Sequence, residues 1–367
     1  MIIVSPIIRT VAKTASLALY ALTLAASYGG YVNPDYFTLP AVLTLTLQYL
    51  AIATFIVAVA WIIGRHIIIG ALGIVTLLIG WSSVESAVPI SFPNTAPEGA
   101  QTFKLLTFNS LHLDDIEKPN APGNRAVQFL INCGADVICL QELENWNDPE
   151  EIHNFPASLR DSLFAVYPYR AGNNGLNSDL KVLSKYPVKL VPGVADLTEY
   201  TRNRFAYFRI DINGKRLGII NMHLTSYSLS DEERKVITDI HNTRTAKNSL
   251  REFKSTIFSK LQHSFQGRAD NVDDMVTLTE NMRGPLIVCG DFNDVPSSWA
   301  YRKMRQAGFQ DAYADTNFGP TITFNQHLFL FHLDQIFYRG DIEPLWVKRQ
   351  KIKTSDHYPL MAEFAFI

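Results

Sequence analysis

The sequence predicts an α/β domain that follows a short membrane module. We expect the domain to be a layered sandwich of two mixed β-sheets flanked by helices, and we expect three transmembrane helices before it. Residues 1–90 hold only three of the 33 basic and two of the 35 acidic residues. Farther along, short apolar segments alternate with amphipathic ones, and several apolar segments end in polar side chains.

The charge balance of residues 91–367 limits the possible functions. This part carries 30 basic and 33 acidic residues, a net charge of −3 that is ordinary for a soluble domain. The whole chain has 22 Phe, 15 Tyr and 5 Trp, enough to form a large core, which excludes a disordered protein. The balance also excludes a strongly basic protein that coats nucleic acid. The nearly uncharged first ninety residues exclude a single soluble enzyme.

Three uncharged stretches follow one another, at residues 14–34, 36–64 and 67–84. A helix needs about 20 apolar residues to cross a hydrocarbon core of ~30 Å. We therefore predict that residues 1–90 bind the lipid bilayer through three transmembrane helices, and that residues 91–101 form a linker. The alternative is two helices and an interfacial segment, because the third stretch is the shortest. A cleaved signal peptide accounts for the first stretch only.

The distribution of cations predicts an orientation. Arg9 and Lys13 precede the first stretch, Arg65 lies between the second and third, and residues 29–39 contain no Lys or Arg. Since cytoplasmic loops are enriched in Lys and Arg, we expect residues 91–367 on the extracytoplasmic side of a bacterial inner membrane. The stretches themselves contain no Asp, Glu, Lys or Arg, so an anchor is a simpler interpretation than a channel.

Residues 102–367 are expected to form one catalytic domain. The continuous apolar run at 136–141 is typical of a strand buried on both faces, and Asn213-Gly214 indicates a tight hairpin turn. Cys133, Cys139 and Cys289 are an odd number and lie in or beside apolar runs, so we expect buried free thiols. Strands are predicted at residues 103–109, 136–141, 180–184, 204–212, 216–223, 285–289, 333–338 and 357–366, helices at 125–133 and 297–307, and a long, mostly helical insertion at 231–262.

Several of these strands carry polar side chains at one end. Strand ends hold such groups over a rigid sheet, which is a common arrangement in active sites. A single Glu or His at such a place is usually solvated or structural, so the combination matters more than any member. The residues, in chain order, are Asn109, Glu142, His223, Asp291, Asn293, Asp334, Asp356 and His357.

In this order the residues resemble the endonuclease/exonuclease/phosphatase family of Mg²⁺-dependent phosphoesterases. The most specific segments are Gly290-Asp291-Phe292-Asn293 and Ser355-Asp356-His357-Tyr358-Pro359, supported by Gln141-Glu142. The resemblance covers about residues 102–367 and leaves the membrane module outside. It implies a two-sheet sandwich and hydrolysis of phosphate esters.

Phosphate-ester hydrolysis explains these residue types. The reaction must neutralise anionic oxygens, form a nucleophile from water and stabilise the leaving oxygen. The resemblance implies Mg²⁺, with Mn²⁺ as a possible substitute, and Mg²⁺ takes a few hard oxygen ligands while it keeps several waters. We expect Glu142 as the first carboxylate ligand, Asn109 as a neutral oxygen ligand or an orienting group, and Asp356 as a second carboxylate.

The resemblance also implies the proton-transfer roles. Asp291 is expected to be the general base that orients and deprotonates water, and Asn293 is expected to hold a phosphate oxygen or Asp291. His357 is expected to contact the scissile phosphate in its protonated form, with Asp334 fixing its tautomer. His223 is expected to bind the phosphate or to assist the leaving group.

Three features carry less weight. Leu111 stands where abasic-site nucleases have an acidic residue, which argues against a second acidic metal contact there and against a role in DNA repair. Arg268 is a weak candidate for substrate binding, weighed against a solvated helix end. The cationic run at residues 348–353 suits an anionic substrate, lipid headgroups or a solvated edge strand.

Taken together, the sequence predicts a membrane-anchored, metal-dependent phosphoesterase. It is expected to hydrolyse phosphodiester or phosphomonoester bonds by in-line attack of a water activated by Asp291. The alternatives are a nuclease acting on DNA or RNA, a lipid phosphodiesterase of the sphingomyelinase type, and a catalytically silent binding protein on the same fold. The expected partner is a nucleic acid, a nucleotide or a lipid headgroup, with DNA ranked lower because the domain is not basic. The sequence indicates no protein partner.

Overall fold

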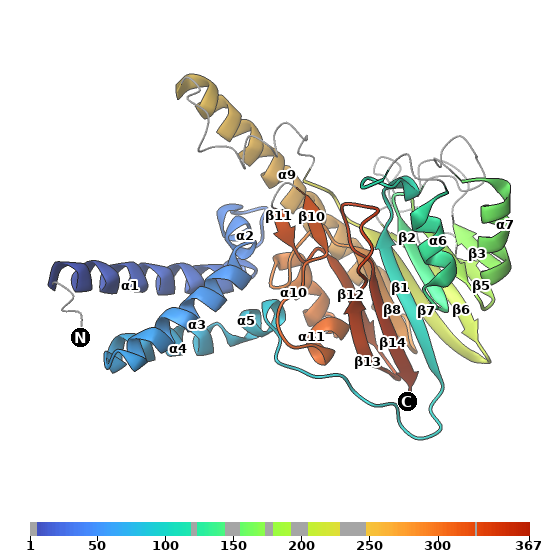
Figure 1. Cartoon of the computed structure of the whole chain (residues 1–367), viewed down its shortest axis with the longest axis horizontal. Helices are drawn as coiled ribbons and strands as arrows, with labels where there is room; N and C mark the ends of the chain where they lie inside the picture. Colours follow the sequence, from blue (N-terminus) through green and yellow to red (C-terminus); the bar gives the residue numbers. More distant parts are fainter. Residues whose placement is uncertain are drawn as a thin grey trace.

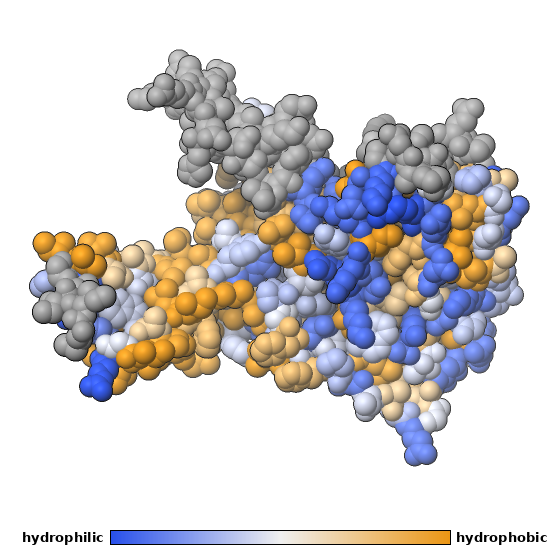
Figure 2. All heavy atoms as spheres, viewed as in Figure 1, coloured by the Kyte–Doolittle hydropathy of each residue, from blue (hydrophilic) through white to orange (hydrophobic). Residues whose placement is uncertain are grey.

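The chain forms an α/β domain from which a group of apolar helices projects on one side (Figure 1). The computed structural model describes residues 6–118, 123–143, 155–172, 179–191, 205–227, 247–326 and 329–367. Figure 2 shows that the projecting helices carry a largely apolar surface, whereas the visible face of the domain is mostly hydrophilic.

The N-terminal helices are formed mainly by the three uncharged stretches of the sequence. They are α1 (Pro6–Gly29), α2 (Leu39–Thr44), α3 (Leu47–Ile63), α4 (Ile67–Ile79) and α5 (Trp81–Ala87). In Figure 1 the N-terminus and the turn between α3 and α4 both lie at the end of this group that is far from the α/β domain. We refer to the described residues 6–87 of the predicted membrane module by the same name, membrane module.

The prediction of three transmembrane helices needs correction. Among the described residues, only α1 is long and apolar enough by itself to cross a bilayer, and α4 with α5 passes the same test as one broken span bent by 81°. The second stretch is interrupted because the hydroxyls of Thr44 and Thr46 donate to backbone carbonyls three residues earlier, which closes a turn between α2 and α3. This leaves α3 with 17 residues.

Within the described residues, the strands form two six-stranded sheets. The first has the order β13 (Ile342–Arg349), β14 (Leu360–Phe366), β1 (Thr102–Asn109), β2 (Val137–Gln141), β4 (Lys181–Ser184), β3 (Tyr169–Gly172). The second has the order β5 (Val188–Leu190), β6 (Phe205–Ile212), β7 (Lys215–His223), β8 (Leu286–Asp291), β12 (Asp334–Arg339), β9 (Gln310–Asp311). The pairs β1–β2 and β7–β8 are parallel and the other neighbours are antiparallel, so the predicted mixed sheets are confirmed.

The two sheets pack face to face around the main core, which includes Phe103, Val137, Ile219, Cys289 and Ile336. Helices α6 (Arg125–Asn132) and α7 (Ala157–Val166) cover the outer face of the first sheet. Helices α9 (Lys247–Thr279) and α10 (Trp299–Gln306) cover the second. The remaining elements are η1 (Leu111–Leu113), α11 (Ala312–Thr316) and the ribbon of β10 (Phe324–Gln326) and β11 (Phe329–Phe331).

Helix α9 is longer toward its C-terminus than the sequence pattern predicted. The predicted end at residue 262 is wrong, because the helix continues to Thr279. Phe265, Ala269, Val272 and Met275 are buried at helical spacing in this extension, so packing outweighs the low helix propensity of Gly267. Residues 231–246 of the predicted insertion lie outside the described residues.

The strand order brings the polar strand ends to one edge of the sandwich. Asn109 pairs with Gln141 across the parallel strands β1 and β2, and His223 pairs with Asp291 across β7 and β8. Asp334 begins β12 directly opposite Asp291. Close approach of β7 and β8 requires Gly290, since a Cβ there would lie 1.9 Å from the carbonyl oxygen of Met222.

Candidate active site

A cavity of about 480 Å³ opens at this edge of the sandwich. Its polar lining includes Glu142, Asp291, Asn293, Asp356 and His357. These side chains come from both sheets, so the pairing of the sheets forms the site. The structure thus brings five residues that the sequence singled out to one cavity.

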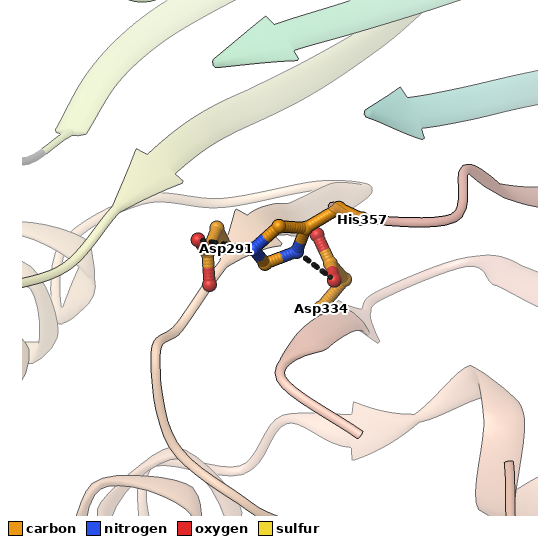
Figure 3. Close-up of side chains that lie close together, drawn as sticks. All are labelled: Asp291, Asp334 and His357. Carbon is orange, nitrogen blue, oxygen red and sulfur yellow. Dashed lines mark hydrogen bonds and ion pairs between the residues drawn. The ribbon is translucent and has the colours of Figure 1, made fainter. Parts of the chain in front are cut away.

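His357 lies between two carboxylates, as Figure 3 shows. Its Nδ1 is 2.8 Å from Oδ2 of Asp334, and its Nε2 is 3.5 Å from Oδ2 of Asp291. Burial by itself would lower the pKa of His357, but the negative charges of Asp334 and Asp291 outweigh it and hold the pKa well above its ordinary value. The two carboxylates therefore favour the protonated imidazole.

Asp291 is held by hydrogen-bond donors on both carboxylate oxygens. The backbone N–H of Asn293 donates to Oδ1 over 2.8 Å, and the side-chain amide of Asn109 donates to Oδ2 over 3.0 Å. Asn293 has φ +48° and donates its own side-chain amide to the carbonyl of Leu224, which joins the ends of β7 and β8. Asn tolerates this left-handed conformation better than most residues. Asp291 is thereby fixed in position before any ligand binds.

Asp179 is a site residue that the sequence analysis missed. Its Oδ2 lies 2.6 Å from Nδ1 of His223, whose Nε2 points toward Glu142 at 3.6 Å and Asp291 at 3.9 Å. Burial would lower the pKa of His223, and the charge of Asp179, with those of Asp291 and Glu142, raises it above the ordinary value. The available signal was an Asp directly before the predicted strand at residues 180–184.

Glu142, Asn109 and Asp356 form the oxygen-rich side of the site. The amide of Asn109 donates to Oε1 of Glu142 over 2.9 Å, and Ser355 Oγ donates to the carbonyl of Asn109 over 2.9 Å and contacts Oδ1 of Asp356 at 3.2 Å. Glu142 has φ +54°, a strained conformation that is concentrated at functional sites. Asn109 presents its amide nitrogen to the carboxylates, an arrangement that suits the orienting role of the two roles that the sequence left open.

The donor set of this side fits a hard divalent cation, because it offers carboxylate oxygens at the mouth of the cavity. A second group of possible ligands, Asp291, Asp334 and His357, has atoms that all lie within 4.8 Å of one another. In that group, Nδ1 of His357 and Oδ2 of Asp334 already bind each other, so a cation would have to use the other atoms of these two side chains or displace their hydrogen bond. The expected ligands Glu142 and Asp356 line the same cavity and would leave this hydrogen bond intact.

Arg268 lies beneath the site and not in its wall. The side chain is fully buried, with Nε 3.2 Å from Oδ2 of Asp294 and Nη1 2.9 Å from the carbonyl of Thr225. The rings of Tyr227 and Phe265 enclose the guanidinium, each with its centroid 4.4 Å from Cζ. This buried position does not suit the expected contact with substrate. The charge of Arg268 instead pairs with the buried carboxylate of Asp294, which is next to Asn293.

Two family models match the chain. Residues 106–357 match the endonuclease/exonuclease/phosphatase family, and residues 9–87 match a domain of unknown function, DUF8431. No curated protein is significantly similar to the chain in sequence. The two matches do not overlap, and residues 88–105 lie between them.

Three solved structures are similar to the chain over nearly all of their own length. The crystal structure of SmcL is 17% identical, covers 74% of this chain and 100% of its own, and has a TM-score of 0.45. An AP endonuclease from Archaeoglobus fulgidus is 17% identical, and the match covers 71% of this chain and 98% of that protein with a TM-score of 0.45. Sphingomyelinase C from Streptomyces griseocarneus is 15% identical, and the match covers 72% of this chain and 99% of that protein with a TM-score of 0.42. Since the family model covers more than half of the residues, the chain belongs to the endonuclease/exonuclease/phosphatase family.

Proposed function

We propose that this protein is a membrane-anchored, metal-dependent phosphoesterase. The observation that carries the proposal is the meeting of Asp291, held by two donors, with a carboxylate-bound His357 in one cavity. A base and a protonated donor side by side suit the attack of water on a phosphate ester.

In the proposed mechanism Asp291 takes the proton of the attacking water. Asn109 and the backbone of Asn293 keep its carboxylate aimed, so little reorganisation precedes the transfer. The protonated His357, held by Asp334, donates a hydrogen bond to a phosphate oxygen on which negative charge increases. His223, held by Asp179, donates to the phosphate or to the leaving oxygen.

Glu142 and Asp356 would hold Mg²⁺, for which Mn²⁺ is a substitute, and Asn109 would keep Glu142 in place. The bound cation would neutralise the anionic oxygens of the substrate. Among the described residues around the site, the groups that suit this purpose are imidazolium groups and amides. The carboxylates there are those of Glu142, Asp179, Asp291, Asp334 and Asp356, so a cation would balance an anionic ester.

Membrane anchoring is supported by the shape and surface of the membrane module. Helix α1 is 24 residues long. Helices α1, α3 and α4 expose large apolar side chains, among them Ile7 in α1, Ile63 in α3, and Ile68 and Leu78 in α4. We place the N-terminus and the α3–α4 turn with Arg65 in the cytoplasm, which puts the α/β domain on the opposite side. An alkaline phosphatase fused to the C-terminus should then be active. An inactive fusion, together with an active cytoplasmic reporter at the same position, would reverse this orientation.

The enzymatic proposal is tested with the purified full chain and bis(p-nitrophenyl) phosphate. We expect Mg²⁺-dependent hydrolysis that EDTA abolishes, and a loss of at least about 10³-fold in kcat for both Asp291→Asn and His357→Gln. Asp161→Asn, on the exposed surface of α7, is the control and should retain the wild-type rate. Wild-type rates in Asp291→Asn or His357→Gln would refute the assignment.

A further inference from the structure

The membrane module reaches into the active-site cavity. Leu45, in the turn between α2 and α3, lines the same cavity as Asp291 and His357. The module is therefore more than a tether, because one of its side chains borders the space in which the substrate must lie.

Direct contacts hold this turn against the α/β domain. The side-chain amide of Gln48 donates to the carbonyl of Leu330 over 3.1 Å, and the hydroxyl of Tyr49 donates to the same carbonyl. Leu330 is the middle residue of β11, and the other two residues of this strand, Phe329 and Phe331, line the cavity. The α2–α3 turn and the β10–β11 ribbon thus form one wall of the cavity.

This wall is apolar and extends to the catalytic histidine. Leu45, Phe329 and Phe331 pack around the buried side chains Val295, Phe324 and Leu333. The ring of Phe324 lies 5.0 Å from the ring of His357, centroid to centroid. A continuous apolar surface therefore leads from the membrane module to the group that would contact the phosphate. Leu111, Ile116 and Leu261 add apolar surface elsewhere around the cavity.

The charge of the cavity disfavours a polyanion. Among the lining residues in the described part of the chain there is no Lys or Arg, whereas Glu142, Asp291 and Asp356 are acidic. A nucleic acid presents a row of phosphates and is normally met by several basic side chains. A cavity with one polar end and an apolar wall instead suits a single phosphate attached to an apolar body.

We propose that the substrate is an amphiphilic phosphoester of the lipid bilayer and that the membrane module forms part of its binding site. The phosphate lies at Asp291 and His357, and the apolar part lies along Leu45, Phe329 and Phe331 and continues into the bilayer. Tyr36 and Phe37 are exposed in the loop before α2, and aromatic rings in such positions favour the membrane–water interface. This inference rests on the proposed phosphoesterase function.

The test uses the full chain reconstituted into vesicles of phosphatidylethanolamine, phosphatidylglycerol and sphingomyelin. Release of water-soluble phosphate esters is compared with hydrolysis of bis(p-nitrophenyl) phosphate and of a single-stranded oligonucleotide. We expect the wild type to hydrolyse a vesicle lipid, and we expect Leu45→Gln to lower the ratio of the lipid rate to the bis(p-nitrophenyl) phosphate rate at least tenfold. Phe331→Gln, on the other side of the same contact, should lower that ratio in the same way.

Leu39→Gln is the matched control, since Leu39 is in the same module, is exposed and does not line the cavity. It should keep the wild-type ratio. Hydrolysis of the small diester without any lipid hydrolysis, faster cleavage of the oligonucleotide than of lipid, or an unchanged ratio in both Leu45→Gln and Phe331→Gln would each overturn the inference. If the wild type fails to hydrolyse even the small diester, the proposed function itself fails.

Discussion

His357 and His223 are held by the same arrangement, a carboxylate on Nδ1 that leaves Nε2 directed toward Asp291. Asp334 binds His357 at 2.8 Å and Asp179 binds His223 at 2.6 Å. Each carboxylate fixes the tautomer and orientation of its imidazole and favours the protonated form. Two imidazoles whose protonated forms are favoured, and whose Nε2 atoms both face Asp291, suit a reaction in which phosphate oxygens gain negative charge.

Asp179→Asn tests the importance of this arrangement at His223. Loss of the carboxylate removes the charge that keeps His223 protonated, so we expect kcat to fall about 10- to 100-fold while KM changes less than threefold. Steady-state kinetics with bis(p-nitrophenyl) phosphate measure both. Asp161→Asn is the control, and a thermal unfolding midpoint near that of the wild type in Asp179→Asn would show that the loss is not a loss of fold. A wild-type kcat in Asp179→Asn would contradict the role.

Arg268 and Asp294 form a buried ion pair, and Asp294 directly follows the segment that contains Asp291 and Asn293. Their side chains are 1% and 4% exposed, so removal of one partner leaves an uncompensated charge in the interior. Burial also raises the pKa of Asp294, and Arg268 opposes that rise. The pair therefore supports the position of Asn293 through the backbone.

We expect Arg268→Met to cost about 3–5 kcal/mol of stability, because the Asp294 carboxylate then lacks its partner. The double variant Arg268→Met/Asp294→Asn should recover at least half of this loss, as thermal unfolding would show. Lys303→Gln, which breaks the exposed pair with Asp273, is the control and should cost less than about 1 kcal/mol. Equal effects of Arg268→Met and Lys303→Gln would contradict the argument.

At the scale of elements, Asp311 joins β9, α10 and α11. Its Oδ1 caps α11 by accepting a hydrogen bond from the backbone N–H of Tyr313 over 2.8 Å. Its Oδ2 accepts a hydrogen bond from the hydroxyl of Tyr301, in α10, over 2.9 Å. Burial raises the pKa of Asp311 to about 6. The cap thus consists of a carboxyl group that binds its proton more tightly in the folded than in the unfolded chain.

This predicts a pH dependence of stability. The contribution of Asp311 is fully present below the unfolded pKa of about 4 and is lost as the pH rises through about 6. Between pH 7 and pH 4, the wild type should therefore gain about 2–3 kcal/mol relative to Asp311→Asn. Thermal unfolding of both proteins across this range gives the difference and cancels the other titrating groups. Parallel profiles for the two proteins would show that Asp311 does not titrate in this way.

For the molecule as a whole, the decisive contact is the one between the membrane module and the α/β domain. Gly30, just after α1, lies against the loop that follows Asp294, and a Cβ there would be 2.0 Å from the carbonyl oxygen of Ser297. Residue 30 thus has no room for a side chain while the two parts are docked. The same docking places Leu45 in the cavity.

Gly30→Val should push the module away from this loop. We expect hydrogen–deuterium exchange to rise at least tenfold in peptides covering residues 39–50 and 292–306, because the contacts of Gln48 and Ser297 are lost. Gly99→Ala, in the linker, has open space around its Cβ position and should leave exchange in both peptides unchanged. Unaltered exchange in Gly30→Val would show that the two parts are not docked in this manner.

Much of the α/β domain could be predicted because its central strands are local patterns. Strands β1, β2, β7 and β8 are buried apolar runs that end in polar residues, and each was predicted within two or three residues of its bounds. Strand β13 was not among the predicted strands because Pro344 does not fit a strand pattern, although a solvated edge strand was one interpretation of the cationic run that begins at Lys348. It lies at the edge of its sheet and has an irregularity at Pro344, where such residues are tolerated.

The sequence by itself determined the chemistry of the strand ends and the division into an apolar module and a balanced domain, because residue type and periodicity are local properties. Only the tertiary structure decided that Asp179 binds His223, that Arg268 is enclosed beneath the site, and that Leu45 borders the cavity. Each of these depends on which distant segments lie side by side. Strand order and packing between the sheets and the membrane module set that arrangement, and no local pattern encodes it.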